Sequence, residues 1–374
     1  MTKILIYAQD AGGARVILPV VQHLLATWKA DIVTITHSHA TQIFRNEGVE
    51  VQQLENLVGK VPLSSEETER LLDEFQPSLI FCTTSENRYD DSNGKLIRAA
   101  SVKGCPCFAS FDHWKGWKRL DRGDEKGYYL PDLLGVIDER ARDFGTSLGV
   151  PDSRMVVVGH PYLEELFLRR GRRSRDFRAV AGLSDTEIVC TLFTQPRIEV
   201  NNRGVEFHGL FKNGREGRFL QIFDKIEQKL EAAGRSLHFF VKSHPKEPPV
   251  EFTKARQPLV DVLDSSVESS RVIAGSDLVI GLDSMILYEA YFSGRPTISL
   301  MFDELAGLDE TFQVVPGILP QASTLDGLDS LLDTMKEIIL SGEPVRMEEY
   351  PLSEGSVGIC ETVIRRMLGH NSGN

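Results

Sequence analysis

One stretch of the sequence brings together side chains that suit acid–base chemistry. Asp112, His113 and Trp114 directly follow the apolar run Cys107–Phe111. A general acid or base needs a pKa near the working pH, which His113 or a partly buried Asp112 could supply. The flat indole of Trp114 could stack on a ring-shaped ligand. The alternative is a helix cap beside a tryptophan that packs in the core.

Two other polar stretches follow apolar runs in the first half of the chain, after Ile4–Ala8 and after Leu79–Cys82. Glycines allow the main chain to approach a ligand closely, and a helix that begins there offers free N–H groups to an anion or a hydroxyl. The spacing differs from that of a dinucleotide-binding loop, and a tight turn without a ligand is the alternative. The binding candidates of the first half are Asp10, Gly12, Gly13, Ser85, Glu86 and Trp114.

Three polar stretches in the second half suit a phosphorylated ligand. Arg197 could hold a diphosphate through its guanidinium fork. Ser284 and the N–H groups beside it could face a phosphate, while Glu289 could accept hydrogen bonds from both hydroxyls of a ribose. Taken singly, each residue could instead be a helix cap or a core contact. The binding candidates of this half are Thr194, Gln195, Arg197, Lys242, His244, Pro245, Asp283, Ser284, Met285 and Glu289.

Short strands alternate with helices along the chain, which predicts an α/β protein with parallel, doubly wound sheets. The strands expected in the first half are Ile4–Ala8, Ile32–Thr36, Val49–Leu54, Leu79–Cys82, Cys107–Phe111, Leu133–Ile137 and Met155–Val158. A second series gives Ile188–Phe193, Leu237–Lys242, Leu278–Ile280 and Thr297–Leu300. Ligands bind beyond the carboxyl ends of such strands, so we expect the polar stretches to converge.

The length of 374 residues and the break in this alternation predict two domains. We expect one Rossmann-like domain over residues 1–165, with a helix over 355–374 that packs back onto it. The second domain is expected over residues 180–350.

Composition and charge exclude several classes of function. The chain is 41% hydrophobic and 26% charged with a formal net charge of −12, so nucleic-acid binding is not expected. Five scattered cysteines predict neither a disulfide framework nor a zinc site. No apolar run is long enough to span a bilayer, and the chain begins without a signal-peptide pattern, which predicts a cytoplasmic protein.

An arginine-rich stretch, Arg169–Arg178, interrupts the α/β pattern. It predicts a solvated helix or an interdomain connector. The alternative is a patch that holds the protein at the inner membrane face, near anionic lipid, or near an anionic acceptor.

Two motifs in the second half resemble a known superfamily. Lys242-Ser243-His244-Pro245, followed by Asp283–Ala290 and Gly294–Thr297, resembles the donor half of GT-B glycosyltransferases. The pattern is similar to that of non-hydrolysing UDP-N-acetylglucosamine 2-epimerases and of His-Pro-containing capsule sialyl-, Kdo- and glycerophosphate transferases. Gly159–Tyr162 resembles the turn before the interdomain hinge. The resemblance implies a GT-B fold, with two Rossmann-like domains facing a cleft.

The resemblance also implies roles for the candidates. The second domain would bind a UDP-, CMP- or CDP-linked sugar, with Ser284 and Met285 at the phosphates, Glu289 at the ribose and His244 at the phosphate or sugar. The first-half candidates would face the acceptor, with Asp112 or His113 as the base. No metal or other cofactor is expected.

The expected activity is therefore transfer of a sugar from a nucleotide-activated donor to an acceptor hydroxyl, in the biosynthesis of a polysaccharide, a lipid-linked glycan or another glycoconjugate. Two stretches typical of the epimerases are replaced here, by Gln195–Glu199 and by Thr84–Glu86. A sugar-nucleotide epimerase or hydrolase is the first alternative. A non-catalytic GT-B protein that binds a partner in a polysaccharide assembly complex is the second.

Overall fold

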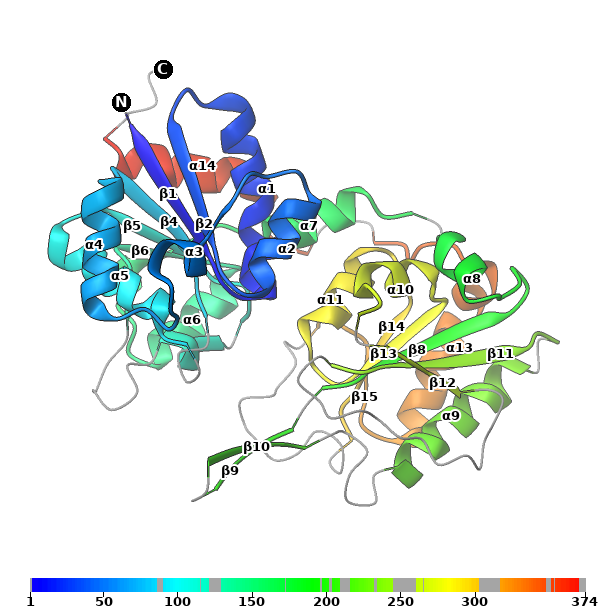
Figure 1. The fold of residues 1–374 in the computed structure, drawn as a ribbon. Helices are drawn as coiled ribbons and strands as arrows, with labels where there is room; N and C mark the ends of the chain where they lie inside the picture. The colour runs from blue at the N-terminus through cyan, green and yellow to red at the C-terminus, as the bar shows by residue number, and fades with distance from the viewer. Residues whose placement is uncertain are drawn as a thin grey trace. The chain divides into compact units, whose positions relative to one another are not determined.

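The chain folds into two compact units (Figure 1). Unit 1 comprises Met1–Glu165 and Tyr350–Asn374, and unit 2 comprises Leu166–Glu349. In the computed structural model, the described residues are 2–85, 90–114, 116–120, 129–171, 173–195, 197–201, 204–208, 216–231, 234–244, 260–264, 266–302, 317–347, 351–352 and 354–369.

Unit 1 is built on a parallel sheet with the strand order β3-β2-β1-β4-β5-β6-β7. Its strands are β1 (Lys3–Ala8), β2 (Asp31–Thr36), β3 (Gln52–Gln53), β4 (Leu79–Thr83), β5 (Cys107–Ser110), β6 (Leu133–Val136) and β7 (Met155–Val157). Every residue of the central strand β4 is buried. Continuous burial of this kind is typical of parallel strands covered by helices on both faces.

The helices of unit 1 connect these strands (Figure 1). They are α1 (Ala11–Thr27), α2 (His39–Asn46), α3 (Leu54–Val58), α4 (Ser65–Phe75), α5 (Ser92–Lys103), the 3₁₀ helix η1 (Gly116–Leu120), α6 (Glu139–Ser147), the 3₁₀ helix η2 (Asp152–Arg154) and α14 (Ser356–Met367). Helix α4 begins with a capping box, in which the Ser64 and Glu67 side chains accept hydrogen bonds from each other's backbone N–H groups. Helix α7 (Pro161–Leu168) runs from unit 1 into unit 2.

The C-terminal helix α14 packs on α1, although the two helices are more than 300 residues apart (Figure 1). Cys360, Val363 and Ile364 of α14 belong to the same buried cluster as the apolar face of α1. Glu361 fastens the contact, because its carboxylate accepts hydrogen bonds from Trp28 Nε1 at 2.8 Å. Burial raises the pKa of Glu361, but hydrogen bonds from Trp28, Arg365 and His23 outweigh it and lower the pKa to about 2.

Unit 2 contains a second parallel sheet, with the order β12-β11-β8-β13-β14-β15. Its strands are β8 (Ile188–Phe193), β11 (Leu237–Lys242), β12 (Val260–Leu263), β13 (Leu278–Gly281), β14 (Thr297–Leu300) and β15 (Gln321–Ala322). The helices are α8 (Asp176–Val180), α9 (Glu216–Glu231), α10 (Ser269–Gly275), α11 (Met285–Phe292) and α13 (Leu325–Ser341). A separate antiparallel pair, β9 (Arg197–Asn201) and β10 (Gly204–His208), follows β8.

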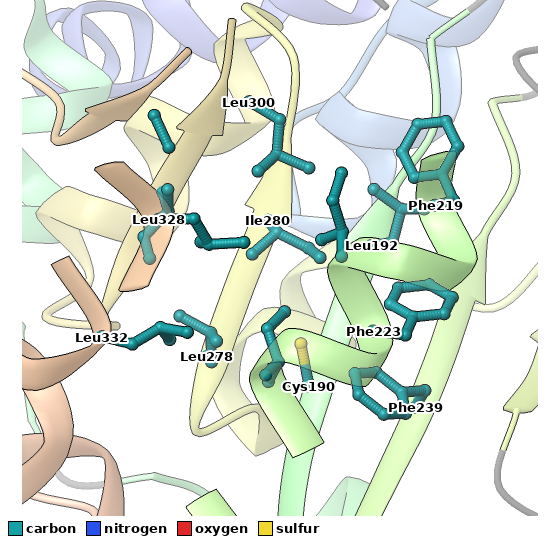
Figure 2. Close-up of a cluster of buried hydrophobic side chains, with 14 of the residues drawn as sticks. Cys190, Leu192, Phe219, Phe223, Phe239, Leu278, Ile280, Leu300, Leu328 and Leu332 are labelled. Atoms are coloured by element: carbon teal, nitrogen blue, oxygen red, sulfur yellow. The ribbon is translucent and has the colours of Figure 1, made fainter. Parts of the chain in front are cut away.

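One face of this sheet carries the core of unit 2 (Figure 2). Phe219 and Phe223 of α9 pack on Leu192, and the rings of Phe223 and Phe239 stack with their centroids 4.5 Å apart. Leu328 and Leu332 of α13 cover the same face beside Leu278 and Ile280. Apolar burial on this scale makes unit 2 a folded domain with its own core.

The arginine-rich stretch contributes to the interior of unit 2. Arg178 is 1% exposed and pairs with the fully buried carboxylate of Asp277 at 3.0 Å. Arg173 binds the other oxygen of Asp277. The prediction of a solvated helix is therefore wrong for Arg173 and Arg178, which fasten the start of unit 2 to Asp277, the residue before β13. The alternative of an interdomain connector stays a prediction. Contact of this stretch with anionic lipid stays a prediction.

Candidate functional site

The strand order of unit 1 reverses between β1 and β4, since the chain continues from β1 to one edge and from β4 to the other. The loops that follow such a pair of strands part from each other and leave a crevice that binds ligands in open α/β sheets. Asp10 and the first turn of α1 lie after β1, and Thr84 and Ser85 lie after β4. The structure thus brings two of the predicted stretches to one edge.

Gly12 and Gly13, at the start of α1, leave room for two other side chains of unit 1, those of Asp112 and Thr83. A Cβ on Gly12 would lie 2.3 Å from Asp112 Oδ2. A Cβ on Gly13 would lie 2.7 Å from Thr83 Cβ. The glycines therefore let Asp112 and Thr83 approach the helix, and contact of this turn with a ligand stays a prediction.

Asp112 is a buried carboxylate with a fixed position. It is 3% exposed, and Arg119 of η1 donates a hydrogen bond to its Oδ1. The positive end of α1 lies beside its Oδ2, and both neighbours stabilise negative charge. Because a carboxylate has about four lone-pair positions, Asp112 keeps the capacity to accept a further hydrogen bond.

Trp114 does not offer a stacking surface. Its side chain is 2% exposed, and its Nε1 donates to Asp138 Oδ2 at 3.0 Å. Trp117 packs on Phe111 and donates to the Trp114 carbonyl at 3.1 Å. The expectation that Trp114 stacks on a ligand is therefore wrong, because both indoles lie inside unit 1 and hold the segment that carries Asp112.

Two histidines flank Asp112. His113 is half-buried. His160 is 2% exposed, and burial lowers its pKa to about 4, although the charge of Asp112 opposes this shift. At neutral pH the ring of His160 is therefore uncharged, and its Nδ1 accepts a hydrogen bond from Leu163 N at 3.2 Å. Sequence reasoning missed His160 and Arg119 as neighbours of the carboxylate, since no local pattern connects either of them with it.

A second cluster of charged groups lies at the same edge of unit 1. His37, which directly follows β2, contacts Glu55 Oε1 through Nδ1 at 2.5 Å and Asp90 Oδ2 through Nε2 at 2.9 Å. Hydrogen bonding to Asp90, helped by Glu55, raises the pKa of His37. Gln9 Nε2 donates to the Asp90 carbonyl at 3.2 Å, and Gln9 Oε1 accepts from the Tyr7 hydroxyl at 3.1 Å. This network ties the loop before α5 to the ends of β1 and β2.

The sheet of unit 2 reverses between β8 and β13, which predicts a second ligand crevice there. Thr194 Oγ1 accepts a hydrogen bond from His244 N at 3.0 Å, so the loops after β8 and β11 are joined. His244 and Gln195 are half-buried beside it. Lys242 is 3% exposed and donates to the Asp264 carbonyl at 3.0 Å. Burial lowers the pKa of Lys242.

Helix α11 begins at the same crevice. Ser284 is its N-cap and makes no side-chain cap hydrogen bond, and the first turn of the helix holds no acidic residue. Its first N–H groups therefore form a ready site for a phosphate. Asp283 and Glu289 are 8% and 7% exposed, so two carboxylates are held at the start and in the middle of this short helix. Ser299 Oγ donates to the Leu282 carbonyl, and this hydrogen bond ties β14 to the loop between β13 and α11.

Some predicted residues fall outside what the structure describes. Glu86 and Pro245 lie outside the described residues, as does the side chain of Arg197. Their roles stay predictions.

No protein-family model matches the chain, and no curated protein matches it. Several solved structures, in contrast, match the chain over nearly its whole length. The UDP-GlcNAc 2-epimerase from Methanocaldococcus jannaschii superposes with a TM-score of 0.65 at 13% identity, over 98% of this chain and 99% of that one. The fold is GT-B.

Further structures agree with this assignment. UDP-GlcNAc 2-epimerase from Neisseria meningitidis bound to UDP-GlcNAc gives a TM-score of 0.62 at 14% identity, over 97% of this chain and 100% of that one. The glycotransferase of kitacinnamycin gives 0.51 at 13% identity, over 98% of both chains. Identities this low establish the fold alone. The predicted α/β class with two doubly wound sheets is confirmed, while a cleft between the two units stays a prediction.

Within the described part of the chain, no helix has both the length and the apolar character needed to cross a membrane.

Proposed function

We propose that this protein is an enzyme that acts on a nucleotide sugar, with the nucleotide bound by unit 2. The arrangement at α11 supports this proposal most directly: a helix N-terminus whose N-cap Ser284 makes no side-chain cap hydrogen bond lies at the strand-order reversal, and the buried carboxylate of Glu289 follows five residues after Ser284. The helix N-terminus would bind the diphosphate, and Glu289 would accept hydrogen bonds from the ribose hydroxyls. We take UDP as the first nucleotide to test because similar structures contain UDP or UDP-GlcNAc.

Two reactions of the bound sugar follow from this proposal. The whole-chain likeness to several UDP-GlcNAc 2-epimerases favours a change of configuration at the sugar ring. The fixed carboxylate of Asp112, with Arg119 against one oxygen, favours the second candidate, which is transfer to an acceptor hydroxyl. In transfer, Asp112 would take the proton of the attacking hydroxyl.

Product analysis separates these reactions. The protein is incubated with UDP-GlcNAc alone and with added monosaccharide acceptors, and the sugar is followed by NMR while released UDP is measured. A new sugar configuration without an acceptor indicates epimerisation, and UDP release that requires an acceptor indicates transfer. The same assay is repeated with other UDP-sugars. If none of them is turned over or bound, the proposed function is wrong.

The variant Asp112→Asn tests whether this carboxylate acts as the base, because asparagine keeps the shape of the side chain and removes its basicity. We expect transfer to slow by about 100- to 10,000-fold, as for loss of a general base. The Asp329→Asn variant, on α13, is the control and should keep full activity. Independence from metal is part of the proposal, and equal rates with and without EDTA test it.

A further inference from the structure

His37 joins two segments of unit 1 that are separate in the chain. Its Nδ1 lies 2.5 Å from Oε1 of Glu55, which is in the first turn of α3. Its Nε2 lies 2.9 Å from Oδ2 of Asp90, which precedes α5 by two residues. Only 12% of the histidine side chain is exposed. The proposed reaction uses neither contact.

Both contacts can be hydrogen bonds only while the ring of His37 carries two protons. An ionised carboxylate only accepts hydrogen bonds, and a neutral imidazole has a single N–H to donate. The imidazolium therefore satisfies Glu55 and Asp90 together. In the neutral ring, one nitrogen lone pair faces a carboxylate oxygen at hydrogen-bond distance, which is repulsive, so one of the two contacts must break.

The contact with Glu55 is held less firmly than the contact with Asp90. Asp90 Oδ1 also accepts a hydrogen bond from Ser92 N at 2.9 Å, and the Asp90 carbonyl accepts one from Gln9 Nε2. The Glu55 side chain is 40% exposed, and its Oε2 has no hydrogen-bond partner within the described part of the chain. A neutral His37 should therefore keep its proton on Nε2, toward Asp90, and lose Glu55.

Other titratable groups near this ring come from β1, from α2 and from the start of α5. Burial raises the pKa of Tyr7 well above its ordinary value, and the charges of nearby carboxylates, Asp10 among them, act in the same direction. The phenol of Tyr7 therefore stays protonated at neutral pH. Asp91 pairs with Lys95 at 2.8 Å. His39 is exposed and forms no ion pair with the residues that the structure describes.

Glu55 belongs to a segment at the edge of the sheet. Strand β3 is the edge strand and pairs with β2 over two residues, and α3 is five residues long. Within Gln52–Val58, Leu54 is the only side chain in the buried class. Elements with few buried contacts open locally at low free-energy cost, so a single charged contact can decide how often this segment opens.

We propose that His37 is a proton-controlled clamp: its imidazolium holds Gln52–Val58 to the segment before α5, and loss of one proton releases Glu55 and loosens this edge of unit 1. Hydrogen bonding to Asp90 raises the pKa of His37, although burial opposes the shift. The clamp is therefore fully closed below the ordinary histidine pKa of about 6.5 and opens as the pH rises through the higher value of the folded protein.

Hydrogen–deuterium exchange of the full chain, measured by mass spectrometry from pH 5 to 9, tests the clamp. Each exchange rate is divided by the intrinsic rate at the same pH. The backbone N–H groups of Gln52–Val58 should exchange about 10- to 100-fold faster at pH 9 than at pH 5, as for loss of a charge-assisted hydrogen bond. Those of the central strand β4 should not change. The midpoint should coincide with the titration of His37, followed by NMR of the histidine-labelled protein.

Three variants separate the clamp from general effects of pH. The amide of Glu55→Gln can accept from the imidazolium or donate to a neutral Nδ1, so Gln52–Val58 should stay protected across the whole range. His37→Asn is too short to reach both partners, so the segment should exchange at the fast rate at every pH. His23→Asn removes another histidine that contacts a carboxylate, Glu361 at 2.8 Å, and is the control that should follow the wild type.

Three results would overturn the inference. The first is a corrected exchange rate of Gln52–Val58 in the wild type that does not change with pH. The second is a pH response that persists in Glu55→Gln, because the carboxylate would then not be the group that the neutral ring repels. The third is a pH response that persists in His37→Asn, because another group would then control the segment.

Discussion

Replacement of Gly12 by alanine tests whether the first turn of α1 fixes the Asp112 carboxylate. The new Cβ would lie 2.3 Å from Asp112 Oδ2, whereas ordinary contact begins at 3.4 Å. The carboxylate must therefore move by about 1 Å. A displacement of about 1 Å can lower a catalysed rate about 100-fold. We expect turnover by Gly12→Ala to fall by about this factor.

The stability change follows from the same contact. Alanine in place of glycine inside a helix stabilises by about 0.5–1 kcal/mol when space is free. At Gly12 the overlap opposes this gain, since overpacking costs about 1–3 kcal/mol. The free energy of unfolding of Gly12→Ala should therefore equal that of the wild type or fall by up to about 2 kcal/mol. Gly358 in α14 is the matched control, because a Cβ there meets nothing within 4 Å.

Urea unfolding followed by circular dichroism gives the stabilities, and turnover of the UDP-sugar substrate gives the rates. Gly358→Ala should be more stable than the wild type and fully active. The reasoning is refuted if Gly12→Ala gains the same stability as Gly358→Ala and keeps full activity, because the carboxylate would then not lie against α1 or would not take part in the reaction.

Two further predictions concern charged groups outside the chemistry. Asp90 raises the pKa of His37, so this interaction stabilises the fold below the unfolded-state pKa of about 6.5 and is lost as the pH rises through the folded-state value. His37→Asn should remove that part of the pH dependence in urea melts from pH 5 to 9, and an unchanged profile would contradict the assignment. Asp277→Asn should lower the free energy of unfolding by about 3–5 kcal/mol, because the buried charge of Arg178 loses its partner. Asp329→Asn, at a partly exposed pair, should lower the free energy of unfolding far less. Equal losses in both variants would show that the buried pair stabilises the fold no more than the partly exposed one.

The sheets could be predicted because their strands carry their own signal. Leu79–Cys82 and Ile188–Phe193 are short apolar runs between polar stretches, and both form central strands. The expected strand Val49–Leu54 is wrong in extent, since only Gln52–Gln53 pairs with β2 and the buried Leu54 begins α3 instead. The edge strand β12 was missed because an edge strand is half exposed and lacks a continuous apolar run.

The site could be predicted as a set of loops but not as a set of contacts. The rule that ligands bind at the carboxyl ends of strands located the polar stretches around Thr84, Asp112 and Ser284. Which side chains meet there depends on tertiary packing, as the contact of Gly12 with Asp112, 100 residues away, shows. A local sequence pattern does not encode such a contact, so the sequence did not predict that Gly12 leaves room for the Asp112 carboxylate.

Binding of UDP to unit 2 is the claim on which the account depends, and calorimetric titration of the wild type and Glu289→Gln tests it most directly. Glu337→Gln, an exposed change on α13, is the control. The account predicts that UDP binds the wild type and the control equally and binds Glu289→Gln at least about tenfold more weakly, as expected for loss of a charge-assisted hydrogen bond. Equal affinity for UDP in all three proteins, or binding by none, would contradict it.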